Sequence, residues 1–329
     1  MIICRTPTRI SFFGGGTDYP IWYRENNGMV LSTTINKYSY ITLRYLPRIF
    51  DYNFRVRYFN TEETLTLDEI KHPSVRECAR ILGIKDGFEM IHYADLPSGT
   101  GLGSSSTFTV GMLHSFYSLI NYMPTKRELA VQALKVEQEV IGESVGSQDQ
   151  VAAAFGGFNQ IQFGGEKEFE VDPIILGKNR MRELQDKLLL CFTGFSRSAS
   201  EIAQHQIRDT PARLKELNAM SDLTIEALSV MKNTASHLDD FGKLLNEQWK
   251  IKRSLTAQVS TPEVDEIYEV AIKNGALGGK LLGAGGGGFM LFYADPLKHD
   301  AIRNSLSDKQ FISFRFEDTG SKIVYYSHE

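Results

Sequence analysis

The chain has few cysteines and no marked excess of charge of either sign. Its three cysteines, Cys4, Cys78 and Cys191, are far apart and match no metal-binding spacing. We therefore expect reduced, buried thiols in a cytoplasmic protein, because a disulfide framework needs paired cysteines. The 36 basic and 40 acidic residues leave a formal net charge of -4. This balance argues against a basic face for nucleic acid and against a polybasic membrane anchor.

Signals of several other protein classes are missing as well. No apolar run reaches the roughly 18 residues needed to cross a bilayer, and no signal-peptide pattern is present. The seven histidines form no pair at metal-binding spacing. The P-loop signature Gly-x-x-x-x-Gly-Lys-Ser/Thr is absent, and so is the His-Arg-Asp catalytic loop of protein kinases. A length of 329 residues with 42% hydrophobic content allows two domains, each with its own core.

The most informative stretch is residues 97–106, which reads Pro-Ser-Gly-Thr-Gly-Leu-Gly-Ser-Ser-Ser. Alternate glycines let the backbone approach a ligand closely, and the serines can begin a helix whose free N–H groups face an anion. A strand-like run precedes the stretch at 88–94, and an apolar segment follows at 108–119. The pattern predicts a strand, a phosphate-binding glycine loop and a buried helix. A plain turn before a core helix is the alternative.

Two further glycine-rich segments lie near the ends of the chain. Residues 14–19 read Gly-Gly-Gly-Thr-Asp-Tyr after an N-terminal strand, so Asp18 can accept hydrogen bonds from ligand hydroxyls. An Asx-turn or helix cap is the commoner use of such an aspartate. Residues 283–288 read Gly-Ala-Gly-Gly-Gly-Gly between two strand-like runs. This segment matches Gly-x-Gly-x-x-Gly but lacks the following helix that dinucleotide binding requires.

Two carboxylates stand out between these segments. At helical spacing, residues 125–141 form one apolar arc that includes Val136 and Val140, and Glu137 lies in the middle of it. A carboxylate buried there needs a metal ion, a buried arginine or strong donors. Asp149 follows Ser147 in the first turn of a short Ala-rich helix, where it can merely complement the helix dipole.

The remaining pattern predicts an α+β protein of two domains, residues 1–180 and 181–329. The polar composition of residues 164–187 indicates that the domain boundary lies in this stretch. Strands at 311–316 and 323–326 are expected to finish the second domain. The other expected strands are 28–34, 38–45, 54–59, 158–163, 187–192, 276–282 and 289–293, and the other expected helices are 73–82, 201–217, 221–236, 240–255 and 261–275.

Together, residues 7–19, 97–106 and 280–289 resemble in order and spacing the three motifs of the GHMP kinases, named for galactokinase, homoserine kinase, mevalonate kinase and phosphomevalonate kinase. The resemblance implies an N-terminal domain like domain 2 of ribosomal protein S5, a ferredoxin-like C-terminal domain, and ATP and sugar between them. Gly-Gly-Gly-Thr-Asp-Tyr-Pro is most similar to the bacterial D-glycero-D-manno-heptose 7-phosphate kinases. Galactokinases usually carry Glu-His where this chain has Gly15-Gly16, which weakens a galactose assignment.

The resemblance also implies residue roles. Asp149 would take the proton from the sugar hydroxyl, and Arg9 would steady the charge on the transferring phosphoryl group. The ATP phosphates would be wrapped by Pro97, Gly99, Gly101, Gly103, Ser104, Ser105 and Ser106. Mg²⁺ would be held by Ser104 or Ser105 together with Glu137. The substrate would contact Gly16, Thr17, Asp18, Tyr19, Gly285, Gly286 and Arg197, a guanidinium among serines that suits a substrate phosphate.

The implied reaction is ATP-dependent phosphorylation of the anomeric hydroxyl of heptose 7-phosphate, giving the 1,7-bisphosphate for nucleotide-activated heptose and surface polysaccharide. We expect small-molecule partners only, namely sugar phosphate and ATP, without nucleic acid or membrane, and leave the oligomeric state open. An L-fucose or L-arabinose kinase is the alternative within the family, since kinases of those sugars share glycine-rich forms of the first motif. A non-catalytic sugar sensor on the same fold is the alternative outside the enzymes.

Overall fold

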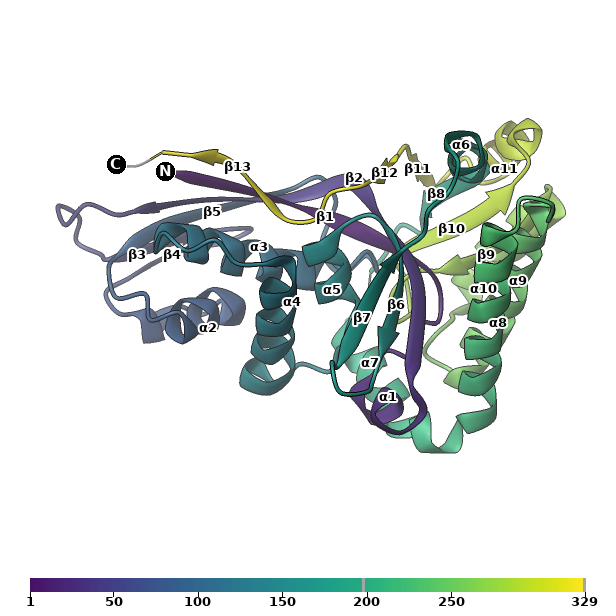
Figure 1. Cartoon of the computed structure of the whole chain (residues 1–329). Coiled ribbons are helices and arrows are strands. Elements are labelled where there is room, and N and C mark those ends of the chain that lie inside the picture. Colours follow the sequence, from purple (N-terminus) through teal and green to yellow (C-terminus); the bar gives the residue numbers. More distant parts are fainter. Residues whose placement is uncertain (197–198, 328–329) are drawn as a thin grey trace.

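The computed structural model describes residues 1–196 and 199–327, which form two β-sheets with helices packed on them (Figure 1). Within these residues the first sheet has nine strands. Six of the strands follow the order β13-β1-β2-β5-β3-β4 across the sheet. In addition, β6 and β12 pair with β2, and β7 pairs with β6. Its strands are β1 (Ile2–Phe13), β2 (Gly28–Tyr45), β3 (Phe54–Arg57), β4 (Thr61–Thr64), β5 (Phe88–Ala94), β6 (Phe158–Phe163), β7 (Phe169–Pro173), β12 (Phe316–Glu317) and β13 (Lys322–Tyr326).

The second sheet has four strands in the described residues, in the order β11-β8-β10-β9. These strands are β8 (Leu188–Phe192), β9 (Ala276–Leu281), β10 (Phe289–Ala294) and β11 (Gln310–Ile312). All of its pairings are antiparallel, and β9 and β10 are consecutive strands that form a hairpin. The glycine segment 283–288 therefore joins two neighbouring strands of this sheet.

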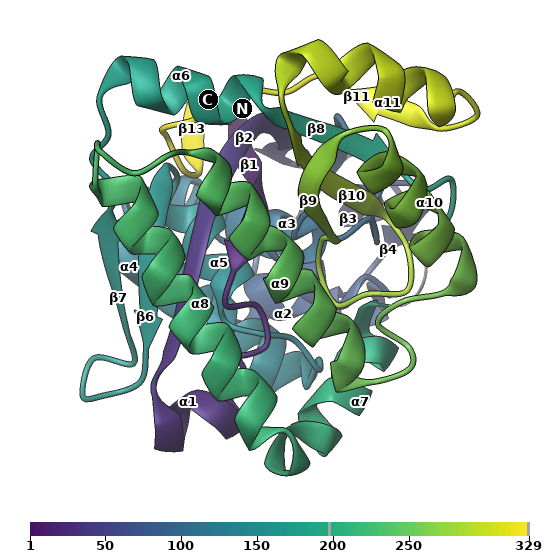
Figure 2. The same ribbon diagram turned by 90° about the vertical axis from the view of Figure 1, so that its right-hand side faces the viewer.

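Helices cover one face of the first sheet and one side of the second sheet. In Figure 1, α2 to α5 lie below the first sheet, and Figure 2 shows α8 and α9 crossing the opposite end of the molecule. The helices are α1 (Pro20–Asn26), α2 (Pro73–Ile81), α3 (Ser104–Leu119), α4 (Lys126–Leu134), α5 (Gln148–Phe155), α6 (Lys178–Asp186), α7 (Ala199–Asp209), α8 (Leu214–Lys232), α9 (Asp239–Leu255), α10 (Pro262–Lys273) and α11 (His299–Ser305), with the shorter turns η1 (Leu67–Glu69), η2 (Lys135–Ile141), η3 (Thr210–Ala212) and η4 (Pro296–Lys298).

The first strand contributes to two hydrophobic cores. Ile2 and Cys4, near its start, belong to the core that α3 fills beneath the first sheet. Ile10 and Phe12, near its end, belong to a second core that includes Phe241 of α9 and residues of β8 and β10. This explains why the strand changes from alternating burial to continuous burial along its length. One strand thus links the two sheets through their cores.

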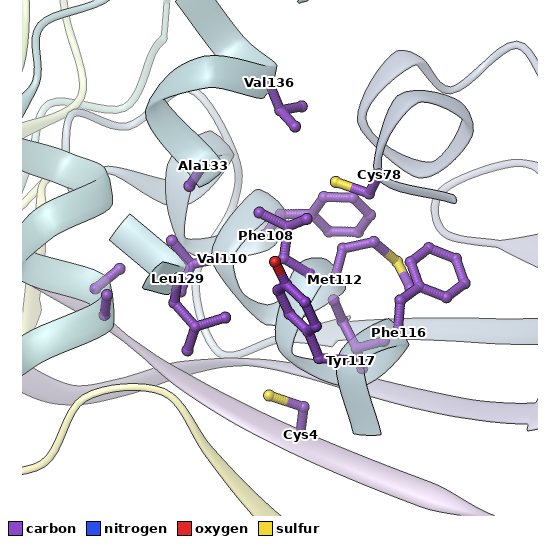
Figure 3. Packing of buried hydrophobic residues seen from close by; sticks show 14 of the residues in the cluster. Cys4, Cys78, Phe108, Val110, Met112, Phe116, Tyr117, Leu129, Ala133 and Val136 are labelled. Carbon is purple, nitrogen blue, oxygen red and sulfur yellow. The ribbon is translucent and has the colours of Figure 1, made fainter. Parts of the chain in front are cut away.

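The helix predicted after the decapeptide is the centre of the first core (Figure 3). Phe108, Met112 and Phe116 of α3 are buried, as the apolar spacing predicts. Phe116 meets Phe88 of β5 edge to face at 5.0 Å between ring centroids. The three cysteines are free and buried, which confirms the expectation for the thiols. The start of α3 is therefore anchored rigidly against the sheet.

The helix predicted over residues 125–141 differs from expectation in its second half. A capping box between Thr125 and Glu128 begins α4, but from Lys135 to Ile141 the chain forms the π-helix η2. The wider turn moves side chains off the arc that α-helical spacing predicts. Val140 is consequently 44% exposed, whereas Val136 and Glu137 are buried. Short π-helical segments of this kind are frequent at functional sites.

Other expectations are wrong as well, and one is the single strand at 311–316, which is divided between β11 of the second sheet and β12 of the first. The helices expected at 201–217 and 221–236 are divided instead at Pro211, because proline cannot supply the N–H that a continuing helix needs. The strand at 323–326, expected to finish the second domain, is part of β13 and pairs antiparallel with β1 of the first sheet. The predicted boundary between residues 180 and 181 falls within α6 and stays a prediction. In the described part of the chain, no helix has the length and apolar content to cross a membrane.

Candidate active site

The three glycine segments meet in space, although almost the whole chain separates the first from the last. A Cβ added at Gly101 would lie 2.4 Å from the carbonyl oxygen of Leu282, and one at Gly283 would lie 2.5 Å from the Cα of Gly101. The N–H of Phe289 donates to the carbonyl of Thr100 at 3.0 Å. Backbone therefore packs directly on backbone between the second and third segments, which only glycine permits at these positions.

The glycine loop leads into the N-terminus of α3. Gly99, Gly101 and Gly103 all have positive φ, at 71°, 84° and 75°, so each takes the left-handed conformation that side chains disfavour. Gly103 occupies the cap position, and Ser104 begins the helix. The unpaired N–H groups and positive dipole end of this 16-residue helix favour an anion.

One pocket is enclosed by these segments and by residues from α5, α7 and α9. Most predicted site residues form its wall, namely Arg9, Gly16, Asp18, Tyr19, Gly99, Gly101, Gly103, Ser104, Ser105, Ser106 and Asp149. The wall also contains residues to which the sequence analysis assigned no role in the site, namely Ser11, Gly15, Ser144, Val145, Gly146, Gln148, Ala203, Gln206, Lys252, Lys280, Gly283 and Ala284. The predicted phosphate-binding, catalytic and substrate-binding segments therefore face one space.

Five predicted residues lie behind the wall, and one lies outside the described residues. The carbonyl of Pro97 accepts from the Thr100 hydroxyl at 2.8 Å, and the Thr17 hydroxyl donates to the carbonyl of Gly14 at 2.8 Å. The N–H of Gly286 donates to Val259 at 3.0 Å. Contacts of this kind shape the loops. The residues behind the wall are Pro97, Thr17, Glu137, Gly285 and Gly286, and Arg197 falls outside the described residues.

Arg9 connects the glycine loop to Asp149. Its Nε and Nη2 both lie 2.7 Å from Asp149 Oδ1, and its Nη1 donates to the carbonyl of Gly101 at 2.7 Å. The guanidinium is buried and the carboxylate is half-buried. Burial raises the pKa of Asp149, the Arg9 charge opposes this shift, and the Asp18 charge adds to it. The carboxylate is thus positioned and its proton affinity is increased.

Asp18 holds the first glycine segment against the start of α5. One carboxylate oxygen accepts from the N–H of Gly16 at 2.8 Å, and the other accepts from Gln148 Nε2 at 3.0 Å. Its carbonyl accepts from the N–H of Ser147 at 2.9 Å. A Cβ at Gly146 would lie 2.0 Å from Asp18 Oδ2, so that position also requires glycine. Asp18 therefore organises the loop and still forms part of the pocket wall.

Two buried lysines from the C-terminal half add to the positively charged groups of the pocket wall. Lys252 of α9 is 3% exposed and donates to the carbonyl of Gly283. Burial, with the neighbouring Arg9, lowers the pKa of Lys252 to about 8, while Asp18 and Asp149 oppose the shift. Lys280 donates to the carbonyls of Ser11 and Phe12 at 2.9 and 3.0 Å, and burial lowers its pKa well below the ordinary value.

Glu137 lies directly behind the serines of the glycine loop. Its Oε2 accepts from the Ser106 hydroxyl at 2.7 Å and from the Gln150 amide, whereas its Oε1 is buried without a hydrogen-bond partner. None of the ion pairs among residues 1–196 and 199–327 includes Glu137, so the buried salt bridge weighed above does not form. Burial raises the pKa of this carboxyl to about 7, with hydrogen bonds from Ser106 and Gln150 opposing the shift.

Comparison with known families agrees with this geometry. The model of the GHMP kinases N terminal domain matches residues 71–157, and the model of the GHMP kinases C terminal region matches residues 225–312. Together these ranges span more than half of the chain. The chain belongs to the GHMP kinases. The α+β fold expected for this family is confirmed, with its N-terminal domain of the ribosomal protein S5 domain 2 type and its ferredoxin-like C-terminal domain.

Two known proteins are similar to this kinase over most of its length. It is 34% identical over 320 residues to D-glycero-alpha-D-manno-heptose 7-phosphate kinase of Campylobacter jejuni, covering 93% of each chain. It is 25% identical to the bifunctional fucokinase/GDP-fucose pyrophosphorylase of Arabidopsis thaliana, covering 92% of this chain and 31% of that protein.

Solved structures share the fold. A D-glycero-D-manno-heptose 1-phosphate kinase of Bacteroides thetaiotaomicron superimposes with a TM-score of 0.74 over 100% of both chains at 24% identity. Streptococcus pneumoniae phosphomevalonate kinase superimposes with a TM-score of 0.76 over 96% of this chain and 100% of that one at 15% identity. The expectation of an enzyme is confirmed, and the kinase is an ATP-dependent phosphotransferase with a hydroxyl acceptor.

The lysine pKa values predict how stability depends on pH. Since the pKa of Lys252 falls from 10.5 in the unfolded chain to about 8 in the kinase, the unfolded state binds more protons between these values. Stability should therefore rise as pH increases from about 8 to 10.5. We expect Lys252→Met to reduce this rise to the part that Lys280 contributes, and to stabilise the fold at pH 7 by on the order of 1 to 3 kcal/mol, because a buried charge is lost.

Urea denaturation of the wild type and the variant across this pH range measures the effect. Lys250→Met is the matched control, because Lys250 lies on the same helix, is half-exposed and pairs with Glu247 at 2.8 Å. The control should keep the wild-type pH dependence. An unchanged pH dependence in Lys252→Met would show that the ammonium group is not desolvated.

Proposed function

We propose that this kinase transfers the γ-phosphoryl group of ATP to the anomeric hydroxyl of D-glycero-D-manno-heptose 7-phosphate. The product is the 1,7-bisphosphate, a precursor of nucleotide-activated heptose for surface polysaccharide. The observation that carries the proposal is the meeting of Asp149, Arg9 and Asp18 with the N-terminus of α3 in one pocket. The similarity to the heptose 7-phosphate kinase of Campylobacter jejuni supports the choice of sugar.

Asp149 is the proposed general base. Its carboxylate faces the pocket, and its raised pKa brings its basicity closer to neutral pH, where a base works best. An anomeric hydroxyl is more acidic than an ordinary alcohol, so a carboxylate suffices to take its proton. Arg9 holds Asp149 at 2.7 Å and places a buried positive charge beside the transferring phosphoryl group.

The loop from Pro97 to Ser106 is the proposed phosphate-binding element. Gly99, Gly101 and Gly103 bring backbone against the ATP phosphates, and Ser104, Ser105 and Ser106 supply hydroxyl and N–H donors. The family uses ATP as the donor, so this anion site has a defined ligand. In-line transfer between tightly held groups depends mainly on positioning and on charge neutralisation.

The residues behind the loop fit a magnesium ion. Glu137 Oε1 is buried without a partner, and a carboxylate oxygen with hydroxyl oxygens is a donor set that Mg²⁺ accepts when phosphate oxygens complete it. Among the described residues no three Asp, Glu, His or Cys side chains cluster as a metal site, which suits an ion bound partly by the nucleotide. Ser104 or Ser105 and Glu137 would hold Mg²⁺, which would neutralise phosphate charge when bound.

The sugar would lie against the first glycine segment. Gly16, Asp18 and Tyr19 form the wall beside Asp149, with Thr17 shaping the loop from behind. Gly285 and Gly286 would support the same space from the second sheet. The additional donors Gln148 and Gln206 line the pocket and suit a polyhydroxylated ligand. The role of Arg197 as a substrate-phosphate ligand stays a prediction, as do the cytoplasmic location and the absence of nucleic-acid or membrane partners.

An L-fucose or L-arabinose kinase is the competing assignment, favoured by the 25% identity to the fucokinase of Arabidopsis thaliana. The deciding experiment measures ATP turnover with heptose 7-phosphate, L-fucose, L-arabinose and D-galactose, and locates the new phosphate by NMR. We expect the highest kcat/KM with heptose 7-phosphate and a product phosphorylated at the anomeric position. A higher kcat/KM with a free sugar would overturn the heptose-phosphate assignment.

The base assignment predicts the effect of Asp149→Asn. The amide keeps the shape of the side chain but cannot accept the proton, so kcat should fall by about 10²- to 10⁴-fold. The Kd for ATP should change little, because the isosteric amide keeps the packing of residue 149 against Gly103 of the phosphate loop. Single-turnover kinetics and nucleotide binding measure the two quantities. Turnover near the wild-type rate would remove Asp149 from the mechanism.

The metal assignment predicts the effect of Glu137→Gln. Since the pKa of Glu137 is raised from about 4.5 to about 7, the wild-type fold without metal should lose stability as pH rises from about 4.5 to 7. The variant should lack this loss and should need more Mg²⁺ for half-maximal activity. Thermal unfolding with and without Mg²⁺, together with Mg²⁺ titration of activity, measures both. Unfolding of the variant at unchanged Mg²⁺ dependence would give Glu137 a purely structural role.

A further inference from the structure

A second, small cavity continues from the transfer pocket into the helical part of the C-terminal half. It shares Gly16, Tyr19 and Gln206 with the transfer pocket, so the two spaces adjoin at the first glycine segment. Its remaining wall comes from η3, the first turn of α8 and the end of α9, and includes Arg213 and Thr256. The residues on this wall have no assigned role in binding ATP or in transfer.

Three donors for an anion converge on this cavity. Arg213 contributes a guanidinium group. Thr256 is 7% exposed, and its hydroxyl is buried without a hydrogen-bond partner. Arg213 also occupies the N-cap of α8, so the positive dipole end of this 19-residue helix adjoins the cavity wall. A buried hydroxyl without a partner costs free energy, and a ligand oxygen would recover it.

One carboxylate, that of Asp209, is part of the cavity wall, and it forms an ion pair with Arg208 at 3.0 Å. Glu216, outside the wall, pairs with Arg213 at 3.1 Å. The cavity holds about 10 Å³ in this structure, roughly the space for one water. To bind a larger anion, Arg213 must therefore release the Glu216 carboxylate and bind the ligand instead. This pair is partly exposed, so little stability is lost when it opens.

We propose that this cavity binds the phosphate monoester that the acceptor already carries, through Arg213, the Thr256 hydroxyl and the N-terminus of α8. The inference rests on the proposed function, since only a phosphorylated acceptor needs such a site. The sugar lies along Gly16 and Tyr19, with its anomeric end at Asp149 and its phosphate at Arg213. Lys252, one turn before Thr256 on α9, adds a buried positive charge on the same side of the helix.

The test compares KM values for phosphorylated and unphosphorylated acceptors in three variants. Arg213→Ala should raise KM for heptose 7-phosphate by about 10- to 150-fold, as expected for a lost charge-assisted contact. Thr256→Val, which keeps the shape of the side chain, should raise the same KM by about 2- to 10-fold. KM for ATP and kcat should stay near wild type in both. Arg303→Ala is the matched control, because Arg303 also carries a guanidinium group in an i,i+3 ion pair, is exposed on α11 and lies outside the cavity wall.

Free heptose separates phosphate binding from sugar binding. The Arg213 and Thr256 variants should leave KM for the unphosphorylated sugar unchanged. Equal effects on both acceptors, or no effect in either variant, would overturn the inference. Arg197→Ala is measured in parallel, and a selective effect of that variant alone would place the phosphate at Arg197 instead.

The failures of the two proposals are distinguishable. If the wild type prefers mannose 6-phosphate to heptose 7-phosphate and Arg213→Ala still acts selectively on the phosphorylated acceptor, the heptose assignment fails and the phosphate site stands. If the wild type prefers heptose 7-phosphate and neither variant acts selectively, the phosphate site fails and the heptose assignment stands. Preference for free sugars in the wild type would overturn both.

Discussion

The close contact of two glycine loops decides how this kinase is built. The loop before α3 and the loop between β9 and β10 touch through backbone atoms at Gly101 and Gly283, without side chains between them. The two loops follow strands of different sheets, and they can approach this closely only because both carry glycine at the contact. The N-terminus of α3, the Arg9–Asp149 pair and the lysines of the second half are then brought to one pocket. A methyl group at either glycine would push apart the halves that supply the charges.

The pocket is charged before any ligand enters. Arg9, Lys252 and Lys280 face Asp18 and Asp149, so three cations oppose two carboxylates among the described residues of the wall. Burying cations costs free energy, which is visible in the lowered pKa values of both lysines. Binding of highly charged phosphates would offset this free-energy cost. The same arrangement that destabilises the empty fold therefore strengthens the binding of nucleotide and sugar phosphate.

Local signals in the sequence marked the glycine segments and Glu137, whereas Arg9 and the role of Asp149 came from the resemblance to the GHMP kinases. A triple glycine or a carboxylate on an apolar arc is visible without knowing the fold. The π-helix at Lys135 was not predictable, since its spacing is compatible with an α-helix until the packing decides. Lys252 and Lys280 were missed, although each lies among apolar neighbours in a predicted helix or strand, which is the same signal that identified Glu137. The sheet to which β13 belongs could not be read from a short strand that suits either one.

The two ends of the described chain lie side by side (Figure 1), and the N-terminal amine donates to the carbonyl of Ser327 at 3.0 Å. β1 pairs with β2 on one edge and with β13 on the other. During synthesis on the ribosome, β1 therefore emerges long before β13, its outer neighbour in the sheet. An unpaired edge strand can pair with the wrong partner. This edge of β1 stays open until β13 has been made, so the first sheet cannot be completed before all strands of the second sheet have been synthesised.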